Sequence, residues 1–118
     1  QGLMVTASTI YMSLLGSTGL RNVAANCIKN TDSLKQKLKS VDGIKLLFDG
    51  AGFHEFVIQL ESANAADVIE KMAAKDIVAG VDISAQYPEL GQTILLCVTE
   101  TKTAADLTHF VKELQTAL

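Results

Sequence analysis

The spacing of apolar residues changes once along this chain, and that change constrains the fold more than any other feature. Across residues 3–38 apolar side chains recur every three or four positions, which is the period of one helix face. Across residues 54–60 they alternate instead, so that Phe56, Ile58 and Leu60 share one face of a strand. Helices followed by alternating strands are typical of the α+β class.

The helical region is predicted to contain two helices. Residues 3–15 form one apolar face, which Gly16 and then Gly19 interrupt. Ser17 or Thr18 can cap a second helix. Its apolar stripe comprises Leu20, Val23, Ala24, Cys27, Thr31, Leu34 and Leu38.

The first of these helices has no charged residue between Gln1 and Gly16. A helix so apolar is unsuited to a free surface position. We therefore expect residues 1–16 to be an interface element that packs against something outside this chain.

The strands are read from short apolar runs bounded by turn residues. Residues 44–48 and 54–60 predict a hairpin across a glycine-rich turn. Residues 77–79 predict a short edge strand, and residues 80–92, which hold the single proline, predict a loop. The uniformly apolar run 93–98 predicts a central strand.

Two further helices complete the expected fold. Asn64 begins one, and Thr103 with Asp106 three positions later begins the last, because a hydroxyl and an acid suit the positive end of a helix. The expected architecture is a single α+β domain over residues 1–118, with a small antiparallel sheet of three or four strands covered by helices on one face.

Composition excludes several classes of function. The net charge is −3, Arg21 is the one arginine and the nine lysines are scattered, so the chain lacks the clustered cations that bind nucleic acid. The longest uninterrupted apolar runs are far shorter than the roughly 20 residues that a bilayer requires, and no signal peptide is recognisable. We therefore expect neither nucleic acid nor membrane as a partner.

The two cysteines, Cys27 and Cys97, both lie within apolar patterns. They predict two buried thiols in a reducing compartment, which indicates a cytoplasmic location. Since neither belongs to a CxxC pair, a structural zinc site is not expected.

No set of residues forms an evident active site. His54 and Glu55 are adjacent, and neighbouring residues on a strand point to opposite faces, so they are not expected to act on one substrate atom. His109 is expected to be structural or solvated. Residues 49–52 resemble a phosphate loop, but a strand rather than a helix follows them. Lys102, between two threonines, is read as part of a strand-to-helix turn and not as a Schiff-base lysine.

Several strings, in the same order and over essentially the whole chain, resemble the C-terminal domain of the glycine cleavage system P-protein, in particular subunit 1 of its split bacterial form. The strings are Ile10-Tyr11-Met12-Ser13-Leu14-Leu15-Gly16, Gly19-Leu20-Arg21, Leu46-Leu47-Phe48-Asp49-Gly50, Phe53-His54-Glu55-Phe56-Val57, Tyr87-Pro88-Glu89-Leu90 and Leu95-Leu96-Cys97-Val98-Thr99-Glu100.

The resemblance implies the small C-terminal domain of fold-type I pyridoxal phosphate enzymes, with the large domain absent from this chain. By the same resemblance, the parent complex, glycine dehydrogenase (decarboxylating), is expected to decarboxylate glycine with pyridoxal phosphate and to transfer the aminomethyl group to the lipoyl group of the H-protein. The resemblance also implies P-protein subunit 2, the lysine-bearing chain, as the partner. No catalytic, cofactor-binding or metal-binding residue is carried over to this chain, and no cofactor is expected in it.

The family's Asn/His-Glu-Phe string matches His54, Glu55 and Phe56 and implies a structural or site-facing feature there, with Glu55 the favoured residue. Relatives often have Asn where this chain has His54. Two alternatives remain open: a free-standing regulatory or ligand-binding α+β module, and the small domain of another pyridoxal phosphate enzyme. The latter usually offers an arginine for a substrate carboxylate, and Arg21 is poorly placed for that.

Overall fold

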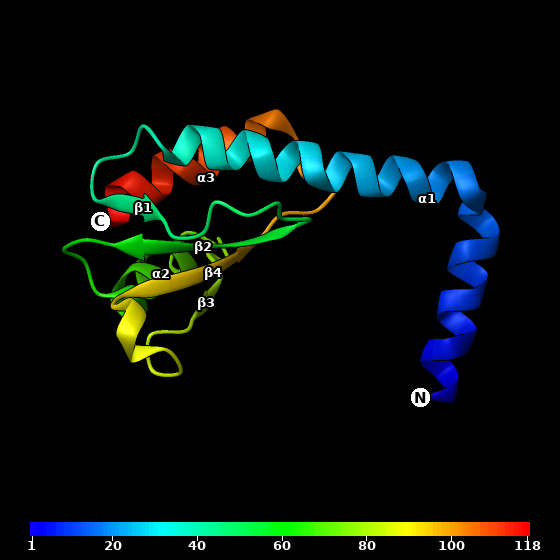
Figure 1. Ribbon diagram of the computed structural model, residues 1–118, viewed down its shortest axis with the longest axis horizontal. Coiled ribbons are helices and arrows are strands. Elements are labelled where there is room, and N and C mark those ends of the chain that lie inside the picture. The colour runs from blue at the N-terminus through cyan, green and yellow to red at the C-terminus, as the bar shows by residue number, and fades with distance from the viewer.

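The computed structural model describes all 118 residues, and its longest element is the helix α1, Gly2–Leu38. Gly16 interrupts α1 with φ 62° and ψ −176°, a conformation that is essentially restricted to glycine. The chain turns sharply there, and the leading arm leaves the rest of the molecule (Figure 1). The predicted division into two helices is confirmed. Gly19, however, stays helical, and neither Ser17 nor Thr18 makes a capping hydrogen bond.

The second arm of α1 buries the last part of its predicted apolar stripe. Cys27, Thr31, Leu34 and Leu38 are buried. Leu20, Val23 and Ala24, the stripe residues nearer the bend, are only half-buried. This part of α1 lies beyond the end of the sheet, which therefore does not cover it (Figure 1). The spacing of apolar residues thus predicts which face of α1 is buried. How far along the helix that burial extends depends on the length of the sheet beneath it.

The leading arm is almost wholly exposed, with Leu3 and Leu14 81% and 82% exposed. By length and composition alone, α1 could cross a membrane: it has 37 residues, and an 18-residue window in it has a mean hydropathy of 1.3 with no residue buried. The expectation that no segment is long and apolar enough to do so is therefore wrong on those two criteria. Gly16 breaks the helix, and Cys27, Thr31, Leu34 and Leu38 of its second arm are buried against the rest of the domain.

Four antiparallel strands form one sheet in the order β1-β2-β4-β3. Their bounds are β1 Ile44–Leu46, β2 Glu55–Leu60, β3 Val81–Asp82 and β4 Thr93–Cys97. The predicted hairpin and the predicted central strand are confirmed, although β1 ends two residues earlier than expected.

The predicted position of the edge strand is wrong. The edge strand is β3 rather than residues 77–79, so the predicted loop 80–92 contains both a strand and the short 3₁₀ helix η1, Pro88–Leu90. Gly80 causes the shift: its φ is 138°, and a Cβ there would lie 2.4 Å from the carbonyl oxygen of Leu95. Only glycine permits this approach to β4, and pairing begins at the next residue.

The remaining helices, α2 Ala65–Ala73 and α3 Ala104–Ala117, begin where the caps predicted. The Asn64 side chain accepts hydrogen bonds from the backbone N–H groups of Ala66 and Asp67. Thr103 and Asp106 form a reciprocal capping box at the start of α3.

All three helices cover the same face of the sheet. A single core cluster joins α1, α2 and α3 to one set of strand side chains. That set comprises Phe56, Ile58, Leu60, Ile94, Leu96 and Val98. The opposite face of the sheet has no covering helix, and its side chains Glu55 and Cys97 are exposed. The predicted α+β fold, with an antiparallel sheet covered on one face, is confirmed.

Candidate functional site

Three side chains that can bind a metal ion or transfer a proton lie close together where β2 begins and β4 ends. Pairing of the two strands sets Glu55 directly opposite Cys97. His54 precedes β2 in a bend, and its carbonyl oxygen accepts a 2.8 Å hydrogen bond from Val98 N–H. One donor atom from each of His54, Glu55 and Cys97 lies within 4.8 Å of the other two.

We expected strand alternation to keep His54 and Glu55 apart, but a donor atom of each lies within 4.8 Å of the other. Alternation applies to residues within a strand, and His54 lies one position before the strand begins. Both residues were identified from the sequence as site candidates. Cys97 was missed, because the uniformly apolar run around it shows no alternation that would reveal its outward direction.

The imidazole of His54 has an unsatisfied nitrogen. Its Nδ1 is buried and has no hydrogen-bond partner. The Phe53 ring meets the imidazole edge-on, with centroids 4.7 Å apart and planes at 87°. A buried polar atom without a partner costs about 1–3 kcal/mol. Such an atom calls for an explanation in terms of a ligand or a function.

The two cysteines occupy different environments. Cys27 is buried as predicted, and its Sγ donates a 3.4 Å hydrogen bond to Glu100 Oε2. Burial is the main reason that the pKa of the Cys27 thiol is raised above its ordinary value. Cys97 is exposed, so the prediction of two buried thiols is wrong for Cys97.

A cavity of about 610 Å³ lies beside this cluster, where β3 stops and the end of β4 is paired with β2 on one side only. Most of its lining is apolar, with Leu107 and Phe110 of α3 among the residues that form it. Glu55 and Cys97 contribute polar atoms to the same cavity. The donor cluster is thus connected to a space that a small molecule can enter.

The same cavity does not provide the groups that pyridoxal phosphate needs. A phosphate is usually held at the free amino end of a helix, whereas the amino end of α3 is occupied by the carboxylate of its own Asp106, which lines the cavity. The pKa of Asp106 is lowered, chiefly by the hydrogen bond from the Thr103 backbone N–H, so the group is an anion. Lys102 lines the cavity but is exposed, unlike the desolvated lysines that form Schiff bases.

His109, the other histidine, also lines the cavity, and its side chain is 62% exposed. Its Nδ1 lies 3.9 Å from Glu113 one helical turn away, a contact that becomes an ion pair when the ring is protonated. It does not belong to the donor cluster of His54. Its solvated position agrees with the sequence expectation.

The chain is similar in sequence to curated glycine dehydrogenase (decarboxylating) subunits. It is 48% identical over 123 residues to the probable glycine dehydrogenase (decarboxylating) subunit 1 of Thiobacillus denitrificans, covering 100% of this chain and 26% of the relative. It is 46% identical to the protein of the same name from Nitrosospira multiformis, covering 97% of this chain and 25% of that relative. The chain thus spans about a quarter of the length of the curated relatives it matches.

Solved structures share the fold. A crystal structure of glycine decarboxylase (P-protein) of the glycine cleavage system, in inhibitor-bound form, superposes with a TM-score of 0.83 at 24% identity, over 92% of this chain and 24% of that one. A NifS-like protein from Rickettsia africae superposes with a TM-score of 0.67 at 14% identity, over 80% of this chain and 29% of that one. These likenesses confirm the small-domain fold of the fold-type I enzymes that the sequence implied.

The family assignment itself rests on sequence. The family model described as "Glycine cleavage system P-protein" matches residues 1–114 of the 118. This chain therefore belongs to the glycine cleavage system P-protein family.

Proposed function

We propose that this chain is the C-terminal small domain of subunit 1 of glycine decarboxylase. The parent complex decarboxylates glycine with pyridoxal phosphate and passes the aminomethyl group to the lipoyl group of the H-protein. The family match over residues 1–114, together with the shared name of the most similar relatives, carries this proposal. The complex acts in the cytoplasm.

Within that complex the chain is structural and does not hold the cofactor. Its exposed lysine beside the cavity, Lys102, and the carboxylate of Asp106 at the amino end of α3 are unsuited to a Schiff base and a phosphate. The cofactor and its lysine belong to P-protein subunit 2. Subunit 1 completes the assembly in which that lysine works.

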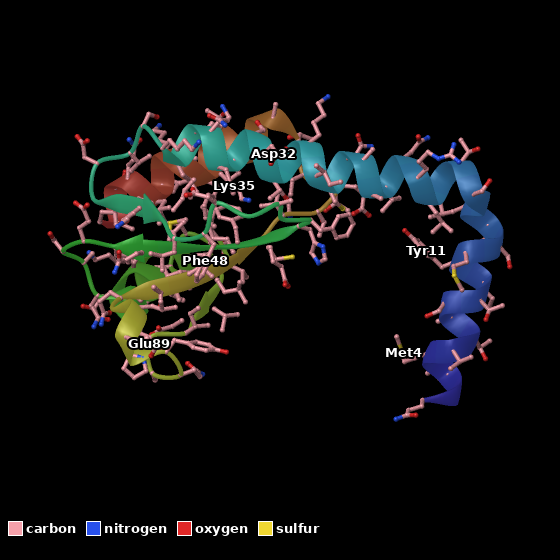
Figure 2. All side chains as sticks on the ribbon, viewed as in Figure 1. Met4, Tyr11, Asp32, Lys35, Phe48 and Glu89 are labelled. Atoms are coloured by element: carbon pink, nitrogen blue, oxygen red, sulfur yellow. The ribbon has the colours of Figure 1, made fainter.

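The leading arm, residues 1–16, is the element that joins this domain to the rest of the assembly. It carries no charged side chain between Gln1 and Gly16, and its large apolar side chains are exposed. Met4 and Tyr11 point to the inner side of the bend (Figure 2). A surface of this kind, with nothing in the domain to cover it, is typical of an interface between proteins or domains.

Glycine-dependent exchange of carbon dioxide in mixtures of the two subunits tests the proposal. We expect exchange only when the complete subunit 1 and the lysine-bearing subunit 2 are both present. Exchange by subunit 1 alone, or by subunit 2 alone at the full rate, would overturn it. Borohydride reduction followed by peptide mapping supplies a second readout: the reduced cofactor should be attached to subunit 2 and to no lysine of this chain.

A pair of variants tests the arm. Leu3→Glu combined with Leu14→Glu places two charges on the arm without touching the core, since both side chains are more than four-fifths exposed. We expect weaker association of the subunits in analytical ultracentrifugation. Val78→Glu is the matched control, because Val78 is 93% exposed but lies in the domain. Equal association of both variants would refute the role of the arm.

The alternatives fit the comparisons less well. A free-standing regulatory module does not account for a family match that includes the leading arm from residue 1. The small domain of another pyridoxal phosphate enzyme would share the fold, as the NifS-like protein does, but the sequence identity to that protein is only 14%.

A further inference from the structure

The cluster of His54, Glu55 and Cys97 offers one nitrogen, one oxygen and one sulfur donor within 4.8 Å of each other. Imidazole, carboxylate and thiolate are the three ligand types that zinc uses in proteins. We propose that this cluster binds a divalent transition-metal ion, Zn²⁺ foremost, through three protein ligands. This site is independent of the proposed role in glycine decarboxylation.

A second observation points to a ligand at the same place. Nδ1 of His54 is buried and makes no hydrogen bond within the chain. Coordination of the metal ion through Nδ1 would give this nitrogen the partner that the chain does not supply. The other histidine, His109, differs in this respect, because its side chain is largely exposed and can form hydrogen bonds with water.

The backbone holds the three residues in place. Glu55 and Cys97 are paired residues on the two central strands, and the hydrogen bond from Val98 N–H to the His54 carbonyl anchors the third. Zinc bonds of about 2.0–2.3 Å require ligand atoms roughly 3.5 Å apart in a tetrahedron. The donors must therefore move inward by roughly 1 Å at most, which rotation of the exposed Glu55 and Cys97 side chains provides without displacing the core.

The surroundings indicate an open site. A three-ligand zinc site leaves a fourth position for water or for a small exogenous ligand, as in catalytic zinc centres. Here Glu55 and Cys97 both border the 610 Å³ cavity, so the fourth position faces that space. On binding, the Cys97 thiol loses its proton to solvent, and the thiolate and the Glu55 carboxylate balance the two positive charges of the ion.

The absence of a CxxC pair led us to expect no structural zinc site. CxxC pairs are typical of closed sites built from neighbouring cysteines. In this chain, strand pairing brings ligands together from distant parts of the sequence, because the register sets Glu55 opposite Cys97.

Cobalt titration of the complete protein tests the proposal, because Co²⁺ replaces Zn²⁺ in such ligand sets and is visible by absorption. We expect one Co²⁺ per chain, with thiolate-to-cobalt charge transfer in the near ultraviolet and visible bands typical of four-coordination. Zn²⁺ should displace the cobalt. His54→Ala, Glu55→Gln and Cys97→Ser should each weaken binding at least about tenfold, and Cys97→Ser should abolish the charge-transfer band.

The chain supplies its own controls. Cys27→Ser and His109→Ala remove the other cysteine and the other histidine and should leave the titration unchanged. Because Glu55 and Cys97 are exposed, their variants retain the core, and circular dichroism verifies the fold. No charge-transfer band in the wild-type protein would overturn the proposal. So would binding that survives Cys97→Ser, or that fails equally in Cys27→Ser.

Discussion

Gly80 provides the sharpest test of how the sheet edge is built, through the substitution Gly80→Ala. Its φ of 138° is a conformation that other residues rarely adopt, and the strain of an alanine there is about 1–3 kcal/mol. The new Cβ would also lie 2.4 Å from the Leu95 carbonyl oxygen and 2.9 Å from Cγ2 of Ile94. Real Cβ contacts do not fall below 3.0 Å, so β3 must move away from β4.

Moving β3 loosens the pairing of Val81 with Leu95 and of Asp82 with Ile94. Each hydrogen bond weakened there contributes about 1 kcal/mol. Strain and lost pairing together predict a loss of about 3–5 kcal/mol from the free energy of unfolding, a large share of the roughly 5–15 kcal/mol of a typical domain.

Urea denaturation followed by circular dichroism measures this loss. Gly43→Ala is the matched control: Gly43 also has a positive φ, 84°, but a Cβ there meets nothing within 4 Å. We expect it to cost about 1 kcal/mol. If Gly80→Ala costs no more than Gly43→Ala, the close approach of β3 to β4 does not determine the edge of the sheet.

The remaining predictions concern the core, the last helix and the thiols. Met72→Ala should lower the free energy of unfolding by about 2–5 kcal/mol in the same urea experiment, because Met72 is completely buried, while Met4→Ala on the exposed arm should have little effect. The pKa of Asp106 is lowered in the folded protein, so its contribution to stability is fully present above the ordinary aspartate value of 3.8 and is lost as the pH falls through the lower, folded value. Accordingly, the melting temperature of Asp106→Asn should lie below that of the wild type at neutral pH and approach it in acid, and a constant difference would contradict the capping role. Alkylation by iodoacetamide followed by mass spectrometry should modify exposed Cys97 readily and buried Cys27, with its raised pKa, only when the protein unfolds; equal rates would contradict the two environments.

The geometry of the donor cluster was only partly predictable from the sequence. His54 and Glu55 stay predicted site candidates, and strand alternation predicted a separation of the two that the structure does not have. The error came from the exact start of β2, and strand boundaries are the least reliable part of a pattern. Cys97 could not be found at all, because a run of apolar residues does not distinguish the covered face of a sheet from the open one.

The sequence by itself determined the kinds of element and their order. It predicted the two arms of α1, the buried residues Phe56, Ile58 and Leu60, and the caps at Asn64 and Thr103. These features are local: hydrophobic periodicity and capping depend on residues a few positions apart. The family resemblance also lay in the sequence, since it rests on strings of residues.

Only the tertiary structure decided the position of the edge strand and the composition of the site. β3 lies where Gly80 lets the backbone approach β4, and Glu55 meets Cys97 because the register of two strands, distant in sequence, sets them opposite each other. The register of strand pairing depends on how the whole sheet packs on its helices, so it cannot be predicted from a short segment of sequence.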